Sequence, residues 1–558
     1  MPGTHFLIVP FALLVAAAPA SIAQSPVFEV SIRSAAASQP VTGRLVLLIS
    51  KTAQPEPRLA LSLRGPVVVG LDLEQVRPDQ PVVVDDAATA YPVKLSAIPP
   101  GDYFVQAVVN VYDQVRRADG KTLWLPMNDG TIEFFTAAAG NLYSDVVPVR
   151  IGDSGNVKVA ITRVVPAAPA RTDTEWIKYV TIQSRKLTQF WGRPIFIHAA
   201  VLLPKGYAEH PNSYYPSVYT LGHSWTPLSF RTTPPTGAAA AAGINPVTGL
   251  ENGYETYRHW NSDAFPRVIA ISLIQQTPYF PDSYSVNSAN NGPYGDAIIE
   301  EVIPYLEERF RIIRKPYARH LEGASTSGWQ TLALQLRNPD FFGGAWVLQP
   351  DPIDFTRYVS TNIYEDTNAF VIPLGPFLTA ERGFQRLRDG QTIHTLRQLS
   401  LFEAVLGSRG RSGFQLGAWE AVYGPADKDG YPAPLWDKLT GTIDRNVANY
   451  MRDNGYDLRA YAERNWATLG PKVAGKLHFF SGDMDDFSLN LAVYQFEEFL
   501  KSTTNPKSDA DFTYGRPMKG HSWHAWTWAE FIHLVADRIK ANAPPGEDIK
   551  GWNYQEKP

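Results

Sequence analysis

Two patterns of apolar and polar positions divide this chain. Up to about residue 165, short alternating or apolar runs recur between turn residues, and helical periodicity is scarce. The runs cover residues 27–32, 43–49, 82–84, 103–109 and 157–165. This pattern predicts an all-β region over residues 25–165, and we expect it to form a β-sandwich.

The second pattern begins near residue 172 and pairs strand-like apolar runs with helix-like runs. The strand-like runs are 317–321, 341–349 and 476–480, and the helix-like runs are 330–336, 489–500 and 528–539. Alternation of this kind predicts an α/β domain with a mostly parallel sheet, here over residues 172–545. The Pro- and Ala-rich segment 166–171 indicates a stiff linker between the two regions.

A single Ser lies where a strand-like run meets a helix-like run. The local sequence is Gly323-Ala324-Ser325-Thr326-Ser327-Gly328, with small residues on both sides of Ser325. A nucleophile at a strand-to-helix elbow needs small neighbours, because the turn is strained and other chain segments approach it closely. We therefore interpret Ser325 as a candidate nucleophile; the alternative is a Gly- and Ser-rich surface turn.

In α/β-hydrolases the catalytic residues follow one another along the chain as Ser, then Asp or Glu, then His. The acid and the base that belong to Ser325 are therefore expected downstream of it. His521 follows a Gly in a loop just before the last predicted helix, where the general base of this fold belongs, and His524 is its competitor. The acid is expected in the turn 481–487, directly after a predicted strand. The other downstream histidines are His394, His478 and His533, and the turn offers Asp483, Asp485 and Asp486.

Several motifs in the right order resemble the esterase D/enterochelin-esterase group of α/β-hydrolases, over about residues 176–543. They are Trp191-Gly192-Arg193-Pro194, the run 215–223, Gly295-Asp296 at the start of a helix, the Ser325 elbow, Gly482-x-x-Asp485, and Gly520-His521-x-Trp523. The resemblance implies an α/β-hydrolase fold and a triad of Ser325, His521 and Asp485. It also implies an oxyanion hole made by the backbone N–H groups of Thr326 and about His223 or Ser224.

The sequence departs from the family pattern at one position of the elbow. The family elbow is Gly-x-Ser-x-Gly, and here Ser327 replaces the second Gly. That Gly lets the helix pack on the strand without a Cβ in the way, and Ser is the next smallest polar residue. We expect Ser327 to be tolerated.

The expected reaction is ester hydrolysis through an acyl-enzyme, with no cofactor or metal. Acyl transfer to an alcohol, peptide cleavage, and a non-catalytic binding role on a hydrolase scaffold are the alternatives. Residues 351–470 far exceed what a minimal hydrolase needs there, and helix-like segments near 396–406, 418–423 and 458–466 favour a cap-like insertion over surface decoration. Four functions remain open for the β region: docking, partial cover of the active-site mouth, carbohydrate contact and simple stabilisation.

Composition argues against nucleic acid and an acidic membrane as partners. The net charge of −4 and the lack of a basic stripe give no electrostatic case for binding nucleic acid. The chain has no Cys, which excludes disulfides and Cys-ligated zinc. It has 14 Trp and 26 Tyr, and Trp523 beside the proposed base is a candidate for contact with a small-molecule or carbohydrate-linked ester.

Residues 1–23 have the features of a secretory signal peptide. An apolar stretch over 6–18 precedes Ser21-Ile22-Ala23, which offers small residues before cleavage at Gln24. A buried first strand is the alternative. No later apolar run is long enough to span a bilayer. The sequence therefore predicts a secreted or periplasmic protein.

Overall fold

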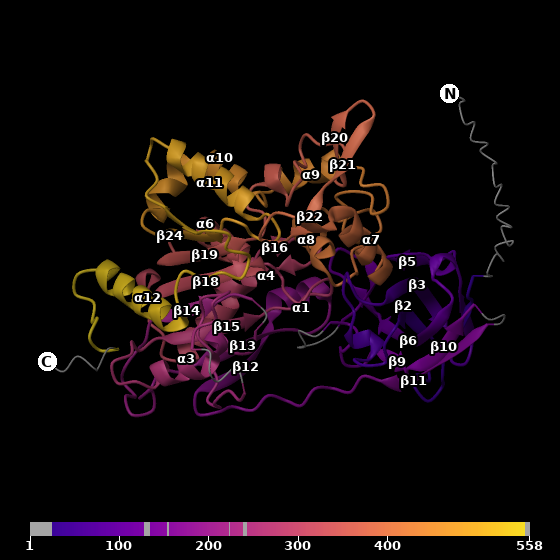
Figure 1. Ribbon diagram of the computed structural model, residues 1–558. Coiled ribbons are helices and arrows are strands. Elements are labelled where there is room, and N and C mark those ends of the chain that lie inside the picture. The colour runs from indigo at the N-terminus through magenta and orange to yellow at the C-terminus, as the bar shows by residue number, and fades with distance from the viewer. Residues whose placement is uncertain (1–24, 128–133, 153–155, 223, 238–242, 553–558) are drawn as a thin grey trace, which may run out of the picture.

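The computed structural model describes residues 25–127, 134–152, 156–222, 224–237 and 243–552. The predicted signal segment 1–23 and His223 lie outside these residues. Within them, the chain forms a β-rich N-terminal region and a larger α/β region (Figure 1).

The N-terminal region is rich in β-strands, as the alternating pattern predicted. Its main sheet has nine strands in the order β4-β1-β11-β9-β6-β2-β3-β5, with β10 paired to β6 beside this path. A separate hairpin joins β7 to β8. The strands are β1 (Phe28–Ile32), β2 (Val41–Ser50), β3 (Val67–Val76), β4 (Pro81–Val84), β5 (Thr89–Tyr91), β6 (Gly101–Val111), β7 (Asp113–Arg116), β8 (Thr122–Leu125), β9 (Leu142–Ser144), β10 (Val147–Ile151) and β11 (Val157–Val164).

Strand β2 is buried on both faces. Leu45 and Leu47 pack with side chains of β1 and β11, which lie far from β2 in the strand order, so the sheet curls around a shared core. The alternate residues Val46 and Leu48 pack against a helix of the α/β region. The part of the sheet around β1 and β11 and the part around β2 thus share one core and belong to one continuous hydrogen-bonded sheet.

The α/β region contains an eight-stranded, mostly parallel sheet in the order β12-β13-β15-β14-β18-β19-β24-β25. All pairs from β15 to β25 are parallel, and β12 and β13 are antiparallel to their neighbours. The strands are β12 (Ile177–Ser184), β13 (Ile195–Leu202), β14 (Ser217–Thr220), β15 (Ile269–Ile274), β18 (Arg319–Ser325), β19 (Gly344–Pro350), β24 (Leu477–Gly482) and β25 (Asp511–Gly515).

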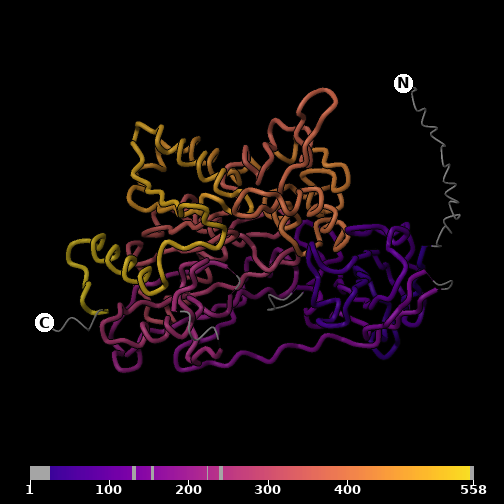
Figure 2. The backbone as a smooth tube through the Cα atoms, viewed as in Figure 1, coloured from indigo at the N-terminus to yellow at the C-terminus, as the bar shows by residue number. Residues whose placement is uncertain are grey.

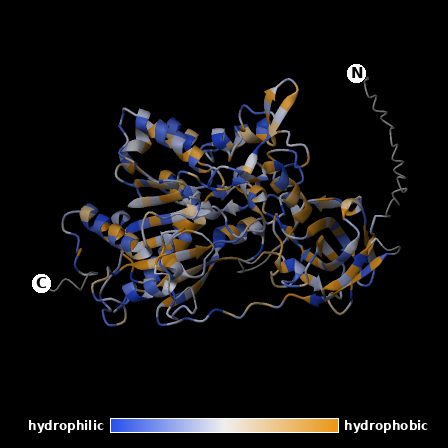
Figure 3. Cartoon of the chain, in the orientation of Figure 1, coloured by the Kyte–Doolittle hydropathy of each residue, from blue (hydrophilic) through white to orange (hydrophobic). Residues whose placement is uncertain are grey.

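Helices cover both faces of this sheet, so its central strands are buried along nearly their whole length. On β19, Ala345 and Val347 join the core beneath α6, α10 and α11, whereas Trp346 and Leu348 join the core beneath α3 and α12. The helices are α1 (Arg185–Trp191), α3 (Gly253–Trp260), α4 (Tyr294–Ala297), which continues through a π-turn (Ile298–Val302) into α5 (Ile303–Arg309), α6 (Thr326–Arg337), α10 (Leu458–Val473), α11 (Asn490–Ser502) and α12 (Trp528–Asn542). Figure 3 shows the hydrophobic residues gathered along the strands of both regions.

Residues 351–470 form a long excursion between β19 and β24. It carries the three helices that the sequence predicted there, together with short hairpins and a further helix. The elements are β20 (Val371–Gly375), β21 (Leu378–Glu381), β22 (Gly383–Arg386), β23 (Thr392–Thr395), α7 (Leu396–Leu406), α8 (Gln415–Tyr423), α9 (Arg445–Asp453) and the start of α10.

The excursion packs directly on the N-terminal region. Phe402, Val405 and Leu406 of α7 share a core with β2, β3 and β6. Arg44 on β2 donates hydrogen bonds to the carbonyls of Ala404 and Val405 at the end of α7, at 3.0 and 2.9 Å. The two regions are therefore joined by this contact as well as by the extended segment between β11 and β12, which runs along one side of the molecule (Figure 2).

Candidate active site

Ser325 ends β18 and is the N-cap of α6, so it sits at a strand-to-helix elbow. Its backbone has φ 61° and ψ −123°, a strained conformation for a residue with a side chain. The turn is possible because its neighbours are small. A Cβ at Gly323 would lie 2.4 Å from the carbonyl oxygen of Ser327, and a Cβ at Gly328 would lie 2.6 Å from that of Leu348.

The structure shows how Ser327 fits where the family pattern has Gly. Its side chain points toward Gly222, which follows β14 and has φ 132°. A Cβ at Gly222 would lie only 2.8 Å from the Ser327 hydroxyl oxygen. The missing side chain at position 222 therefore makes the space that Ser327 occupies.

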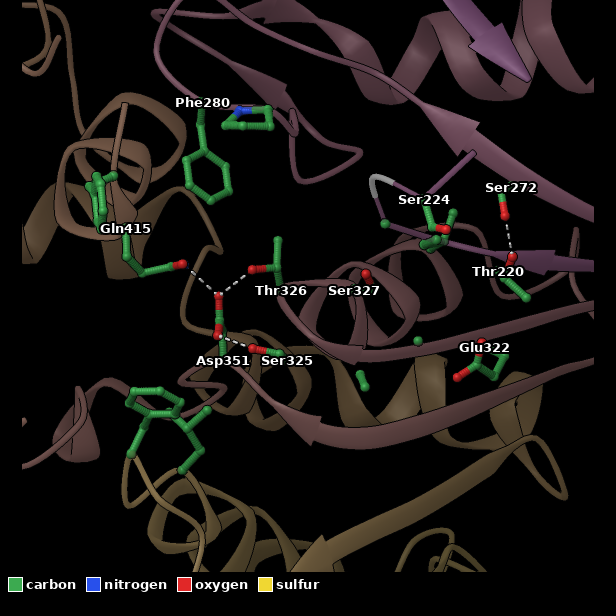
Figure 4. A pocket seen from close by; sticks show the side chains of 18 of the residues that line it. Thr220, Ser224, Ser272, Phe280, Glu322, Ser325, Thr326, Ser327, Asp351 and Gln415 are labelled. Atoms are coloured by element: carbon green, nitrogen blue, oxygen red, sulfur yellow. Dashed lines mark hydrogen bonds between the residues drawn. The ribbon is translucent and has the colours of Figure 1, made fainter. Parts of the chain in front are cut away.

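The hydroxyl of Ser325 donates a long hydrogen bond to Asp351 Oδ1, at 3.4 Å (Figure 4). Asp351 follows β19 directly, and its backbone N–H donates to the carbonyl oxygen of Ser325 at 3.0 Å. The partner of the Ser325 hydroxyl in this structure is thus a carboxylate that the sequence analysis did not name. Its signal in the sequence was a carboxylate just past the strand after the elbow helix.

Asp351 is buried and its other oxygen, Oδ2, is held by four donors. They are Tyr284 Oη at 2.7 Å, Gln415 Nε2 at 2.9 Å, Trp419 Nε1 at 3.1 Å and Thr326 Oγ1 at 3.2 Å. Burial raises the pKa of Asp351, and its hydrogen bonds oppose that shift.

Asp485 and His521, which lie far apart in sequence from Ser325, form a close pair. His521 Nδ1 lies 2.6 Å from Asp485 Oδ2, and the Asp485 side chain is fully buried. Burial alone lowers the pKa of His521, but the charge and hydrogen bond of Asp485 more than offset this, with help from Asp351 and Asp486. The net effect holds the pKa of His521 above its ordinary value.

The competing acids and histidines have other partners. Asp483 Oδ1 accepts from the backbone N–H of Lys519 at 3.0 Å, which is a turn contact. His524 lines the same cavity as Ser325, but its Nδ1 lies 3.0 Å from the backbone oxygen of Ser522, and burial lowers its pKa. The remaining histidines take structural places: His478 pairs with Asp511, His394 contacts Gln385, and the ring of His533 packs on Phe265.

Of two further residues predicted for the site, Thr326 lines the cavity and Trp523 does not. Thr326 is the first residue of α6, next to Ser325, and lines the cavity. Trp523 is not among the residues that line the described cavity. Its ring packs over Gly515, where a Cβ would lie 2.5 Å from the indole, and this contact holds the ring beside β25.

A cavity of about 820 Å³ opens at Ser325. Its walls are mostly apolar and aromatic, and they come from every part of the molecule. Leu63 and Phe134 belong to the N-terminal region. The excursion adds Val359, Phe384, Gln385, Leu399, Phe414, Gln415 and Trp419, and the α/β core adds Leu221, Leu228, Phe280, Phe487, Leu489 and Trp528.

Phe487 lies between the cavity and the Asp485–His521 pair. The ring of Phe487 lies in the cavity wall, and its centroid is 4.9 Å from that of His521 in an edge-on contact. Glu322, on β18, lines another part of the cavity; burial raises its pKa to about 8. In the described part of the chain, no three metal-ligating side chains come together.

Comparison with known families agrees with this architecture. The family model described as "Putative esterase" matches residues 195–533. The chain belongs to this esterase family. The resemblance noted from the sequence motifs is thereby confirmed, and the protein is a carboxylic-ester hydrolase with an α/β-hydrolase domain and an added β-rich region.

Solved structures similar to this esterase include a ferulic acid esterase, with 15% identity, 65% of this chain and 99% of the other covered, and a TM-score of 0.32. An S-formylglutathione hydrolase from Staphylococcus aureus is 14% identical. The match covers 65% of this chain and 99% of the other, with a TM-score of 0.30. A ferulic acid esterase from Anaeromyces mucronatus is 12% identical. The match covers 67% of this chain and 93% of the other, with a TM-score of 0.27. No curated protein matches the chain.

Among the described residues, no helix of the esterase is both long and apolar enough to cross a membrane.

Proposed function

We propose that this esterase is a serine hydrolase in which Ser325, His521 and Asp485 act as nucleophile, general base and orienting acid. The observation that carries the proposal is the 2.6 Å contact between Asp485 and His521 beside a cavity that has the strained Ser325 elbow in its wall. Of the two described imidazoles near the cavity, His521 has a carboxylate partner and His524 has a backbone carbonyl. A carboxylate on Nδ1 fixes the tautomer that leaves Nε2 free to accept a proton.

In this mechanism, His521 Nε2 takes the Ser325 hydroxyl proton as Oγ attacks the ester carbonyl carbon. The carbon–oxygen bond to the alcohol then breaks, and His521 returns the proton to the leaving alcohol oxygen. Water next attacks the acyl-enzyme, giving one proton to His521, which passes it to Ser325 as the acid leaves. Asp485 stabilises the imidazolium in both steps.

The developing oxyanion requires hydrogen-bond donors at a fixed position. The backbone N–H of Thr326 lies in the first turn of α6, where helix N–H groups have no partner within the helix. We place the second donor at about His223, in the segment after β14. Removing one such donor typically costs about 3 kcal/mol of transition-state stabilisation.

The walls of the cavity support a role for the excursion in substrate selection. Residues of α7 and α8, together with Leu63 and Phe134, close the space around Ser325 with apolar side chains. Such walls suit an apolar or aromatic acyl group. We propose that residues 351–470 act as a cap and that the β-rich region completes it.

Residues 1–23 carry the second part of the proposal, which is export to a secreted or periplasmic location. The mature protein would begin at Gln24. Amino-terminal sequencing of protein recovered from a bacterial periplasm tests this, and an intact Met1 in that fraction would contradict it.

The decisive experiment is a panel of chromogenic esters with short, long and aromatic acyl groups. We expect wild-type turnover on some members and a loss of at least about 10³-fold in Ser325→Ala. Ser224→Ala is the matched control, because Ser224 lines the same cavity and, among the described residues, its hydroxyl contacts only Thr226. A fluorophosphonate adduct mapped to Ser325 would agree with the proposal, and full turnover in Ser325→Ala would refute it.

A further inference from the structure

Asp351 is a carboxylate beside the nucleophile that the triad mechanism does not use. It lines the cavity, is 3% exposed, and touches the Ser325 hydroxyl through Oδ1. The Ser325 and Thr326 hydroxyls both face it in Figure 4. A buried carboxylate without a role would cost folding free energy, so its retention at this point requires an explanation.

The two oxygens of Asp351 have different surroundings. Oδ2 accepts from four donors, and two of these, Nε2–H of Gln415 and Nε1–H of Trp419, are donor atoms only. Oδ2 therefore has a full set of hydrogen-bond partners. Oδ1 accepts only the 3.4 Å contact from Ser325 among the described residues, which is long for a hydrogen bond between oxygens.

Within the described residues, no Lys or Arg forms an ion pair with Asp351. His521 is close enough for the Asp351 charge to help raise its pKa. A negative charge so close to Ser325 opposes the negative charge that develops on the substrate oxygen during attack. A positively charged or hydrogen-bond-donating group on the substrate would offset that effect and would also give Oδ1 a full partner.

We propose that Asp351 Oδ1 is a specificity site that binds a hydrogen-bond donor, best an ammonium group, on the acyl part of the ester next to the scissile carbonyl. This inference rests on the proposed function, because it requires the acyl carbon at Ser325 Oγ. A substituent on the carbon next to the carbonyl is then only a few bonds from Oγ and within reach of Oδ1. The substrate class is esters of α-amino acids, with α-hydroxy acids as weaker members.

Tyr284, Gln415, Trp419 and Thr326 fix the carboxylate in this orientation. Trp419 and Gln415 belong to α8, so the cap-like excursion supplies two of the four donors. Their contacts leave Oδ1 as the free side of the carboxylate facing Ser325. A carboxylate held by several donors is pre-organised, so it loses little conformational entropy when it binds its ligand.

Three methyl esters of nearly equal size test the proposal: methyl L-alaninate, methyl L-lactate and methyl isobutyrate. They differ in the group on the carbon next to the carbonyl, which is ammonium, hydroxyl or methyl near pH 7. Values of kcat/KM are measured by acid release and divided by the hydroxide-catalysed rates of the same esters, which removes their intrinsic reactivity. We expect wild type to favour the alanine ester over the isobutyrate by roughly 10- to 100-fold, with the lactate between.

Asp351→Asn keeps the shape of the side chain and removes its charge, so it should bring the corrected alanine-to-isobutyrate ratio close to unity. Asp354→Asn is the matched control, because Asp354 is also a buried aspartate of the excursion and does not line the described cavity. That variant should keep the wild-type ratio. A wild-type ratio near unity, or an unchanged ratio in Asp351→Asn, overturns the proposal.

A second measurement keeps Asp351 intact in case Asp351→Asn fails to fold. Ser325→Ala should bind methyl L-alaninate at least about tenfold more tightly than methyl isobutyrate in calorimetry. Equal affinities would contradict the inference. The proposed function fails separately, through residual turnover of all three esters in Ser325→Ala.

Discussion

At the scale of single residues, the proposed triad predicts that the pKa of His521 sets the lower pH limit of activity. In that mechanism His521 must be neutral to accept the Ser325 proton, and Asp485 with its neighbours holds the pKa of His521 above the ordinary value of about 6.5. Since kcat/KM reports the free enzyme, it should fall as the pH drops through this raised pKa. A pH–rate profile on a neutral ester measures the position of that acid limb.

Asp485→Asn should move the acid limb to lower pH and reduce kcat by as much as ~10⁴-fold, because the charge that raises the pKa and fixes the tautomer is gone. Asp511→Asn is the matched control. Asp511 makes the same 2.6 Å contact with His478 on neighbouring strands, away from the described cavity. A limb that stays in place in Asp485→Asn would contradict the assigned pairing.

At the scale of elements, the junction of β14 with α6 depends on Gly222, whose lack of a side chain leaves room for the Ser327 hydroxyl. Gly222→Ala should destabilise the fold by about 1–3 kcal/mol, because the new Cβ meets the Ser327 hydroxyl and φ 132° disfavours a side chain. Activity should fall as well, since Gly222 precedes the proposed oxyanion segment. Urea unfolding and kcat measure the two effects.

Ser327→Gly in the Gly222→Ala background separates the steric cost from the backbone cost. The double variant should recover the part that comes from the 2.8 Å approach and retain the part that comes from φ. If the two substitutions prove strictly additive, the two residues do not compete for space.

At the scale of the whole molecule, the cavity at Ser325 is completed by a region outside the family match. Phe134 lines the cavity from the N-terminal region, and its ring is 4.8 Å from that of Phe414 in the excursion. Phe134→Ala should raise KM for aromatic acyl esters by about three- to tenfold and leave acetyl esters nearly unchanged. Leu59→Ala is the control, because Leu59 is an exposed apolar residue of the same region that does not line the described cavity. Equal effects on both ester classes would show that the β-rich region does not contribute to selection.

Much of this arrangement could be predicted from local sequence. The elbow at Ser325, the strand that ends before Asp485 and the helix after His521 each depend on residues close together in the chain. The runs at 43–49 and 103–109 likewise became β2 and β6. Local propensity and patterning were sufficient there because most neighbouring residues favoured the same element.

The sequence by itself determined the kind of elements, their order and the position of the elbow, because these follow from short-range periodicity and turn chemistry. Tertiary structure decided which distant residues meet: Asp351 at the Ser325 hydroxyl, Gly222 against Ser327, and Phe134 in the cavity wall. Such contacts depend on how strands and helices pack, and packing is set by many side chains at once. No local pattern encodes that a carboxylate after one strand will face a hydroxyl at the end of the next.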